Sequence, residues 1–138
     1  MSVNSKGINF IISFLFVVNQ YSIAQTSKIW YQSIQIENNR GKIILDFDTT
    51  DIVHSEVWAG NTILIEKRLD IFGLGANSIE RLIANNRYHV NYSNLEQDIK
   101  LEYHFLNKKK LFVKDRTIEE QLSLKIYVPE SMSFKFAD

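Results

Sequence analysis

The sequence predicts an all-β domain with one short helix, and its alternating patterns carry the prediction. In Asp98–Phe105, apolar side chains occupy every second position, and Thr117–Val128 repeats this pattern over a longer stretch. Successive side chains of a strand point to opposite faces, so both segments predict strands with one buried and one solvated face. Such half-solvated strands are typical of antiparallel sheets. We therefore expect an antiparallel β-sandwich, or one curled antiparallel sheet, of about eight strands.

The remaining elements follow from the same pattern and from turn residues. Asn38–Gly41 favours a turn, because Asn and Gly tolerate positive φ. Pro129 ends the last long strand, since proline cannot donate a ladder hydrogen bond. The predicted strands are Ile29–Glu37, Lys42–Phe47, Ile52–Trp58, Thr62–Ile71, Arg87–Tyr92, Asp98–Phe105, Leu111–Val113 and Thr117–Val128, with a short one near Phe134.

A hairpin and a helix lie in the middle of the chain. Ala59–Asn61 separates two alternating runs and predicts a β-hairpin. In its first strand, Val53 and Val57 are expected to face the core, with Trp58 on the outward register. The segment Asn77–Asn85 predicts the helix, with Asn77 as its cap and an apolar stripe at Ile79, Leu82 and Ile83.

The first residues have the pattern of a secretory signal peptide. Lys6 precedes an apolar run, Ile8–Val18, and Ser22-Ile23-Ala24 places small residues where a signal peptidase cleaves. The run is shorter than the roughly 20 residues of a membrane-spanning helix. We expect residues 1–24 to be removed, leaving a single exported β-rich domain, 25–138. An uncleaved N-terminal anchor is the alternative.

Composition narrows the function classes. The chain has 16 basic and 16 acidic residues, so no global charge favours nucleic acid or an anionic membrane. It contains no cysteine, which excludes disulfides, cysteine-based zinc sites and cysteine nucleophiles.

No group of residues predicts catalysis, a cofactor or a metal. Asp46, Asp48 and Asp51 could together bind calcium, although solvated acids at a turn explain them better. The histidines His54, His89 and His104 fall on three different predicted strands, without the spacing of a preassembled metal site. Nucleophile-elbow and phosphate-loop motifs are missing. We therefore expect a protein that is not an enzyme.

A binding surface is the remaining candidate site. The outward registers of Trp58 and Tyr127 indicate a contact surface for an envelope protein or a glycan; equally, another element could cover them. The basic run Lys108, Lys109 and Lys110 could contact phosphates of a polyanion. A solvated loop with lysines that protect a sheet edge is the preferred interpretation of that run. The oligomeric state stays open.

Three phrases together resemble a known family. They are Glu56–Glu66, with Trp before a Gly-Asn turn, Arg87-Tyr88 after the helix, and Ile126–Glu130 at the end of the long strand. Their order is similar to the N-terminal part of an adhesin-like family of exported Gram-negative envelope proteins, over Ile34 to Glu130. In that family the Val-Pro segment leads into a ladder of Gly- and Asn-rich β-repeats, which this sequence lacks. The resemblance implies a location in the periplasm or on the surface of a Gram-negative bacterium, and it implies no catalytic residues.

Two functions are therefore expected. The first is a non-enzymatic exported envelope protein, an adhesin-like binding or structural module. The alternative is a periplasmic small-ligand-binding or inhibitor domain, with a pocket between its sheets lined by Tyr88, Tyr92, Tyr103 and Phe105.

Overall fold

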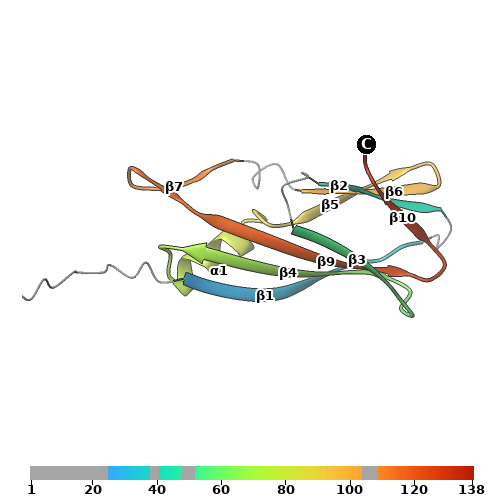
Figure 1. The fold of residues 1–138 in the computed structure, drawn as a ribbon, viewed down its shortest axis with the longest axis horizontal. Helices are drawn as coiled ribbons and strands as arrows, with labels where there is room; N and C mark the ends of the chain where they lie inside the picture. Colours follow the sequence, from blue (N-terminus) through green and yellow to red (C-terminus); the bar gives the residue numbers. More distant parts are fainter. Residues whose placement is uncertain (1–24, 38–40, 48–51, 104–108) are drawn as a thin grey trace, which may run out of the picture.

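The part of the chain that the structure describes folds into two stacked β-sheets, one helix and a projecting hairpin (Figure 1). The computed structural model describes residues 25–37, 41–47, 52–103 and 109–138. The first sheet has the strand order β1 (Gln25–Ile34), β4 (Ile63–Phe72), β9 (Glu120–Pro129), β3 (Ile52–Trp58). The second sheet has the order β10 (Ser133–Phe136), β2 (Lys42–Asp46), β6 (Asp98–Tyr103), β5 (Val90–Leu95). The hairpin joins β7 (Leu111–Val113) to β8 (Arg116–Ile118), and the helix is α1 (Ala76–Ala84).

The predicted all-β class with one short helix is confirmed, but the sheets are mixed rather than purely antiparallel. Strand β4 pairs antiparallel with β1 and β9, and β5 pairs antiparallel with β6. The pairs β3–β9, β2–β6 and β10–β2 are parallel. Alternation reports which face of a strand is buried, and it does not report the direction of the neighbouring strand, so the sequence pattern could not distinguish these cases.

The predicted hairpin between β3 and β4 is wrong, because β9 lies between these two strands. Strand β9 pairs with β4 along one edge and with β3 along the other. Strand β3 is thus left at the edge of the sheet, where Val53 packs against the core and Val57 keeps the inner register beside Val128 but is 51% exposed. The turn residues Ala59–Asn61 mark a reversal of the chain, but they do not determine which strand pairs with β3.

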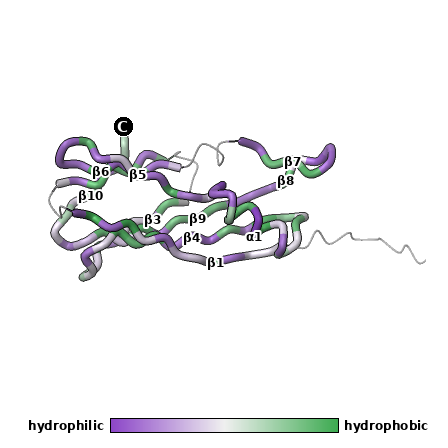
Figure 2. Tube along the Cα trace, turned by 180° about the vertical axis from the view of Figure 1, so that it is seen from behind, coloured by the Kyte–Doolittle hydropathy of each residue, from purple (hydrophilic) through white to green (hydrophobic). Residues whose placement is uncertain are grey.

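The core forms two apolar clusters along the inner face of the first sheet. One fills the space between the sheets and includes Ile65, Leu101 and Ile126, each with no exposed surface. The other lies under α1 and the β7–β8 hairpin and comprises Leu69, Ile71, Ile79, Tyr88 and Ile118. Leu122 packs against both clusters and joins them. Figure 2 shows the layers from behind, with hydrophobic and hydrophilic residues alternating along the strands.

Helix α1 has the predicted apolar stripe but a different start. Ile79 is buried, and Leu82 and Ile83 pack against the second cluster. The cap is Gly75 rather than Asn77, which lies inside the helix, and Glu80 forms an ion pair with Lys28 of β1. Because this ion pair ties the helix to the edge strand, the side chain of Glu80 acts between elements rather than at the helix end. The chain turns out of the helix through a left-handed residue, Asn86, with φ of 61°.

Candidate functional site

The outer face of the first sheet carries a band of aromatic and charged side chains. The strand register places Tyr31, Glu66, Lys125 and His54 in one row across β1, β4, β9 and β3. The next row contains Tyr127 and Glu56. This register brings residues from four strands into one surface, which we call the outer band: Tyr31, Glu56, Trp58, Glu66, Lys125 and Tyr127.

The two aromatic residues predicted to face outward lie together in this band. The ring centroids of Trp58 and Tyr127 are 5.9 Å apart, and the ring planes are tilted by 51°. The Nε1–H of Trp58 donates a hydrogen bond of 2.9 Å to the carbonyl oxygen of Thr62. A Cβ on Gly60 would lie only 2.3 Å from the Trp58 ring, so the indole rests directly against the loop backbone. Trp58 therefore braces the β3–β4 loop, and Tyr31, which is 59% exposed, presents the most accessible ring of the three.

The other residues of the outer band form close contacts between charged and polar side chains. The Nζ of Lys125 lies 3.1 Å from the Glu56 carboxylate and 5.0 Å from the Tyr127 ring centroid. Tyr127 and then Glu56 stabilise the ammonium group, which raises the pKa of Lys125 to about 12. The Tyr31 hydroxyl donates to Glu66 over 3.2 Å, and this contact raises the pKa of Tyr31 above its usual value. The band thus presents aromatic rings with hydroxyl groups beside paired charges, an arrangement suited to binding.

The basic run lies elsewhere. Lys108 is outside the described residues, while Lys109 and Lys110 are exposed and precede β7. Strand β7 projects at one end of the molecule, and the loop after β3 lies at the other end (Figure 1). The predicted lysines and aromatics therefore do not combine into one surface.

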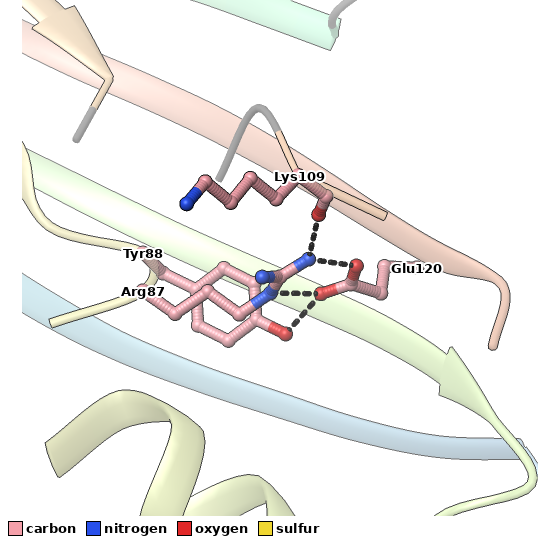
Figure 3. Close-up of polar contacts among 4 residues, drawn as sticks. All are labelled: Arg87, Tyr88, Lys109 and Glu120. Atoms are coloured by element: carbon pink, nitrogen blue, oxygen red, sulfur yellow. Dashed lines mark hydrogen bonds and ion pairs between the residues drawn. The ribbon is translucent and has the colours of Figure 1, made fainter. Parts of the chain in front are cut away.

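A buried polar network on the inner side of the first sheet was not predicted. Arg87, 6% exposed, donates from Nε and Nη2 to the two carboxylate oxygens of Glu120, over 2.8 and 2.6 Å (Figure 3). The Tyr88 hydroxyl donates to the same carboxylate, and Nη2 of Arg87 also reaches the carbonyl oxygen of Lys109 at 2.5 Å. Burial and the carboxylate together raise the pKa of Tyr88 far above its usual value. The network joins the end of the helical turn, β9 and the segment before β7.

A second buried cation lies close to this network. Lys67 of β4 is 2% exposed, and its Nζ donates to Gln32 Oε1 over 2.5 Å and to the carbonyl oxygen of Tyr88 over 2.8 Å. The ammonium also lies 5.8 Å from the centroid of the Trp30 ring. Burial lowers the pKa of Lys67 to about 8. These contacts hold β1, β4 and the turn before β5 together.

Each of the two buried cation sites can be recognised in the sequence by a charged residue in an apolar register. Lys67 occupies the apolar register of its strand, between Ile65 and Leu69, and Glu120 interrupts the apolar register between Ile118 and Leu122. A charged side chain in a buried register needs a partner inside the fold. The signal indicates that a partner exists, but Arg87 lies 33 residues from Glu120 in the chain and only the tertiary fold identifies it.

The acidic and histidine candidates can be placed only in part, because several lie outside the described residues. Asp46 forms an ion pair with Lys100 over 2.8 Å, and Asp48, Asp51 and His104 are outside the described residues. Within the described ranges, no three His, Cys, Asp or Glu side chains are grouped so that they could hold a metal ion.

The residues expected to line a pocket between the sheets are dispersed. Tyr88 belongs to the cluster under the helix, and Tyr103 belongs to the cluster between the sheets. Tyr92 is 52% exposed, and Phe105 is outside the described residues. These side chains therefore do not line one common cavity in the part of the chain that the structure describes.

Comparison of the chain with protein-family models, curated proteins and solved structures found no match. In the described ranges, no helix has the length and apolar character needed to cross a bilayer.

Proposed function

We propose that the chain is a non-enzymatic module of the bacterial cell envelope, exported by residues 1–24, that binds a partner through the outer band of its first sheet. The observation that carries the proposal is the clustering of Trp58, Tyr127 and Tyr31 with paired charges on one uncovered sheet face. Tyr31 is 59% exposed although it lies in a regular strand. An adhesin-like envelope module that recognises a protein or a glycan fits such a surface.

The chemistry of the band supports binding of a partially polar ligand. Aromatic rings with hydroxyl or indole N–H groups offer flat apolar area and a hydrogen-bonding edge, a combination suited to sugar rings and to protein contacts. Glu56 and Glu66 hold Lys125 and Tyr31 in fixed positions, which lowers the ordering cost of binding.

The test is recovery of an envelope protein or glycan from envelope extract by the immobilised protein. We expect Tyr127→Ala and Tyr31→Ala to reduce recovery about tenfold or more, as truncating an aromatic anchor in an interface typically does. Phe112→Ala is the matched control, because Phe112 is 61% exposed on β7, outside the band. Trp58→Ala is less informative, since it also removes the brace of the β3–β4 loop. Equal recovery by all folded variants would contradict the proposal.

Export has its own test. Expression in a Gram-negative host, followed by fractionation and mass spectrometry of the N-terminus, should give a mature chain beginning at Gln25 in the periplasmic or surface fraction. A cytoplasmic chain that retains Met1 would contradict this part of the proposal and leave the binding test independent.

A further inference from the structure

The edge strand β5 has a backbone pattern that leaves part of it available for pairing. Within the described residues, strand β5 pairs antiparallel with β6 alone, and the register ends at Leu95 opposite Asp98, across a two-residue turn. In an antiparallel ladder, successive residues direct their backbone N–H and C=O groups alternately toward and away from the partner strand. The Val90 N–H and C=O bind the Gln32 side chain and therefore point away from β6. By the same alternation, the backbone groups of Tyr92 and Asn94 also point to the free edge.

The side-chain amide of Gln32 hydrogen-bonds to the outer edge of β5 at Val90. Its Oε1 accepts from the Val90 N–H over 3.0 Å, and its Nε2 donates to the Val90 carbonyl oxygen over 2.8 Å. A primary amide thus makes both hydrogen bonds that a neighbouring strand would make at this position. Beyond Val90, Tyr92 and Asn94 of β5 line a groove.

The groove continues along the edge where Gln32 stops. It has a volume of about 400 Å³ and lies between residues 35–37, which follow β1, and the β5–β6 hairpin. Ile36 and Ile99 supply its apolar lining, and Tyr92, 52% exposed, forms part of the wall. An extended segment in this groove could hydrogen-bond to Tyr92 and Asn94 and place alternate side chains against the apolar lining.

The charged residues that line the groove indicate which kind of segment it can bind. Glu37, Glu96 and Asp98 line it, and no lysine or arginine is among its described lining residues. The Asp98 carboxylate accepts a hydrogen bond from the Lys42 backbone N–H but forms no ion pair within the described ranges. A second copy of this chain would bring the same acids to the edge and be repelled, whereas a basic segment is complementary.

We infer that the free edge of β5 accepts an extended, basic segment of a partner protein as an added strand. The site uses residues 35–37 and the β5–β6 hairpin, and it shares no residue with the outer band. The inference therefore goes beyond the proposed function and stands or falls independently of it.

Amide hydrogen exchange in the purified protein tests the geometry directly. The probe is a synthetic peptide of alternating Lys and Val; a peptide of alternating Glu and Val is its control. In the free protein, the amides of Asn91 and Ser93 should be protected by β6, while those of Tyr92 and Asn94 should exchange rapidly. Saturation with the Lys-Val peptide should slow exchange at Tyr92 and Asn94 by about tenfold or more, as expected for new ladder hydrogen bonds.

Two sets of variants separate backbone pairing from charge. Asn94→Pro removes an outward N–H, which edge strands tolerate, and should weaken peptide binding about tenfold or more, whereas Asn94→Ala keeps the N–H and should bind within about twofold. The double variant Glu37→Lys/Glu96→Lys should also weaken binding about tenfold or more. Its control, Glu119→Lys/Glu130→Lys, makes the same charge change outside the groove and should have little effect. The charge variants keep the test usable if Asn94→Pro does not fold.

Three outcomes would overturn the inference. The first is unchanged exchange at Tyr92 and Asn94 with saturating peptide. The second is equal binding of the Lys-Val and Glu-Val peptides. The third is concentration-dependent dimerisation that protects the same two amides without peptide, which would identify a second copy as the occupant.

Discussion

Two lysines on opposite faces of the first sheet meet opposite environments. Lys125 lies in the outer band, is partly exposed, and has the Glu56 carboxylate 3.1 Å away. Lys67 lies on the inner face, is 2% exposed, and is held by the neutral oxygens of Gln32 and Tyr88. The pKa of Lys125 is raised to about 12, and that of Lys67 is lowered to about 8. Hydrogen bonding to Tyr127 and then contact with Glu56 govern the pKa of Lys125, and loss of water governs the pKa of Lys67.

The same contrast applies to the carboxylates beside these cations. Glu56 is exposed, so water screens its attraction to Lys125, and the pair adds little to stability. Glu120 is mostly buried and is the charged partner of Arg87, so its removal leaves a cation inside the fold. The inner polar network is therefore expected to determine whether the domain folds, while the outer band is free to serve binding.

The largest expected effect comes from breaking the inner network. Glu120→Ala should lower the free energy of unfolding by about 3–5 kcal/mol, because Arg87 and the Tyr88 hydroxyl lose their shared acceptor. Urea denaturation measures this change. The neighbouring Glu119→Ala should stay within about 0.5 kcal/mol, since its side chain is exposed. Similar losses for the two variants would show that the network does not stabilise the fold.

The pH dependence of stability tests the environment of Lys67. Its folded pKa is about 8 and its ordinary value is 10.5, so between these values the unfolded chain binds more protons than the folded chain. Stability should therefore rise with pH above about 8, and by pH 10 Lys67 should have contributed about 2–3 kcal/mol of that rise. Below pH 8 this contribution is flat, because the lysine is protonated in both states.

Lys67→Met isolates this contribution. The wild-type-minus-variant difference in the free energy of unfolding, from urea curves at pH 7 to 10, removes the effect of the other titrating groups. Tyr88 opposes the trend only above pH 10, because its raised pKa favours the folded state at lower pH. A difference curve that is flat from pH 8 to pH 10 would mean that Lys67 is hydrated in the folded protein.

The smallest expected effect is on the outer face. Lys125→Met should change the free energy of unfolding by less than about 1 kcal/mol, because the Lys125–Glu56 pair is exposed to solvent. Denaturation at low and at high salt should give nearly the same small difference. A loss of stability as large as that of Glu120→Ala would show that the two faces do not differ in their contribution to the free energy of unfolding.

The sequence pattern located most elements because alternation is a local property. The strands around Leu101 and Ile126 and the helical stripe at Ile79 are where the pattern placed them. Strand neighbours are not local, so the insertion of β9 between β3 and β4 was missed. Parallel pairing was missed for the same reason, because either direction buries the same face.

The site was predictable in part. The outward registers of Trp58 and Tyr127 led to the outer band, but alternation could not show that Trp58 rests on Gly60. Lys67 and Glu120 are charged residues in apolar registers, and the sequence shows this. The identity of their partners depends on contacts distant in the chain. The direction of the Tyr92 backbone depends on the phase of the β5–β6 ladder, which no side-chain pattern encodes.

The position of β9 also affects when the domain can fold during synthesis. The first sheet is completed only by β9, and the second sheet gains its outer strand β10 after that, so both sheets wait for residues 120–136 to be translated. Pairings between distant segments form slowly, because loop closure precedes the contacts that reward it. A nascent chain of this topology therefore stays incompletely folded until β9 and β10 have left the ribosome.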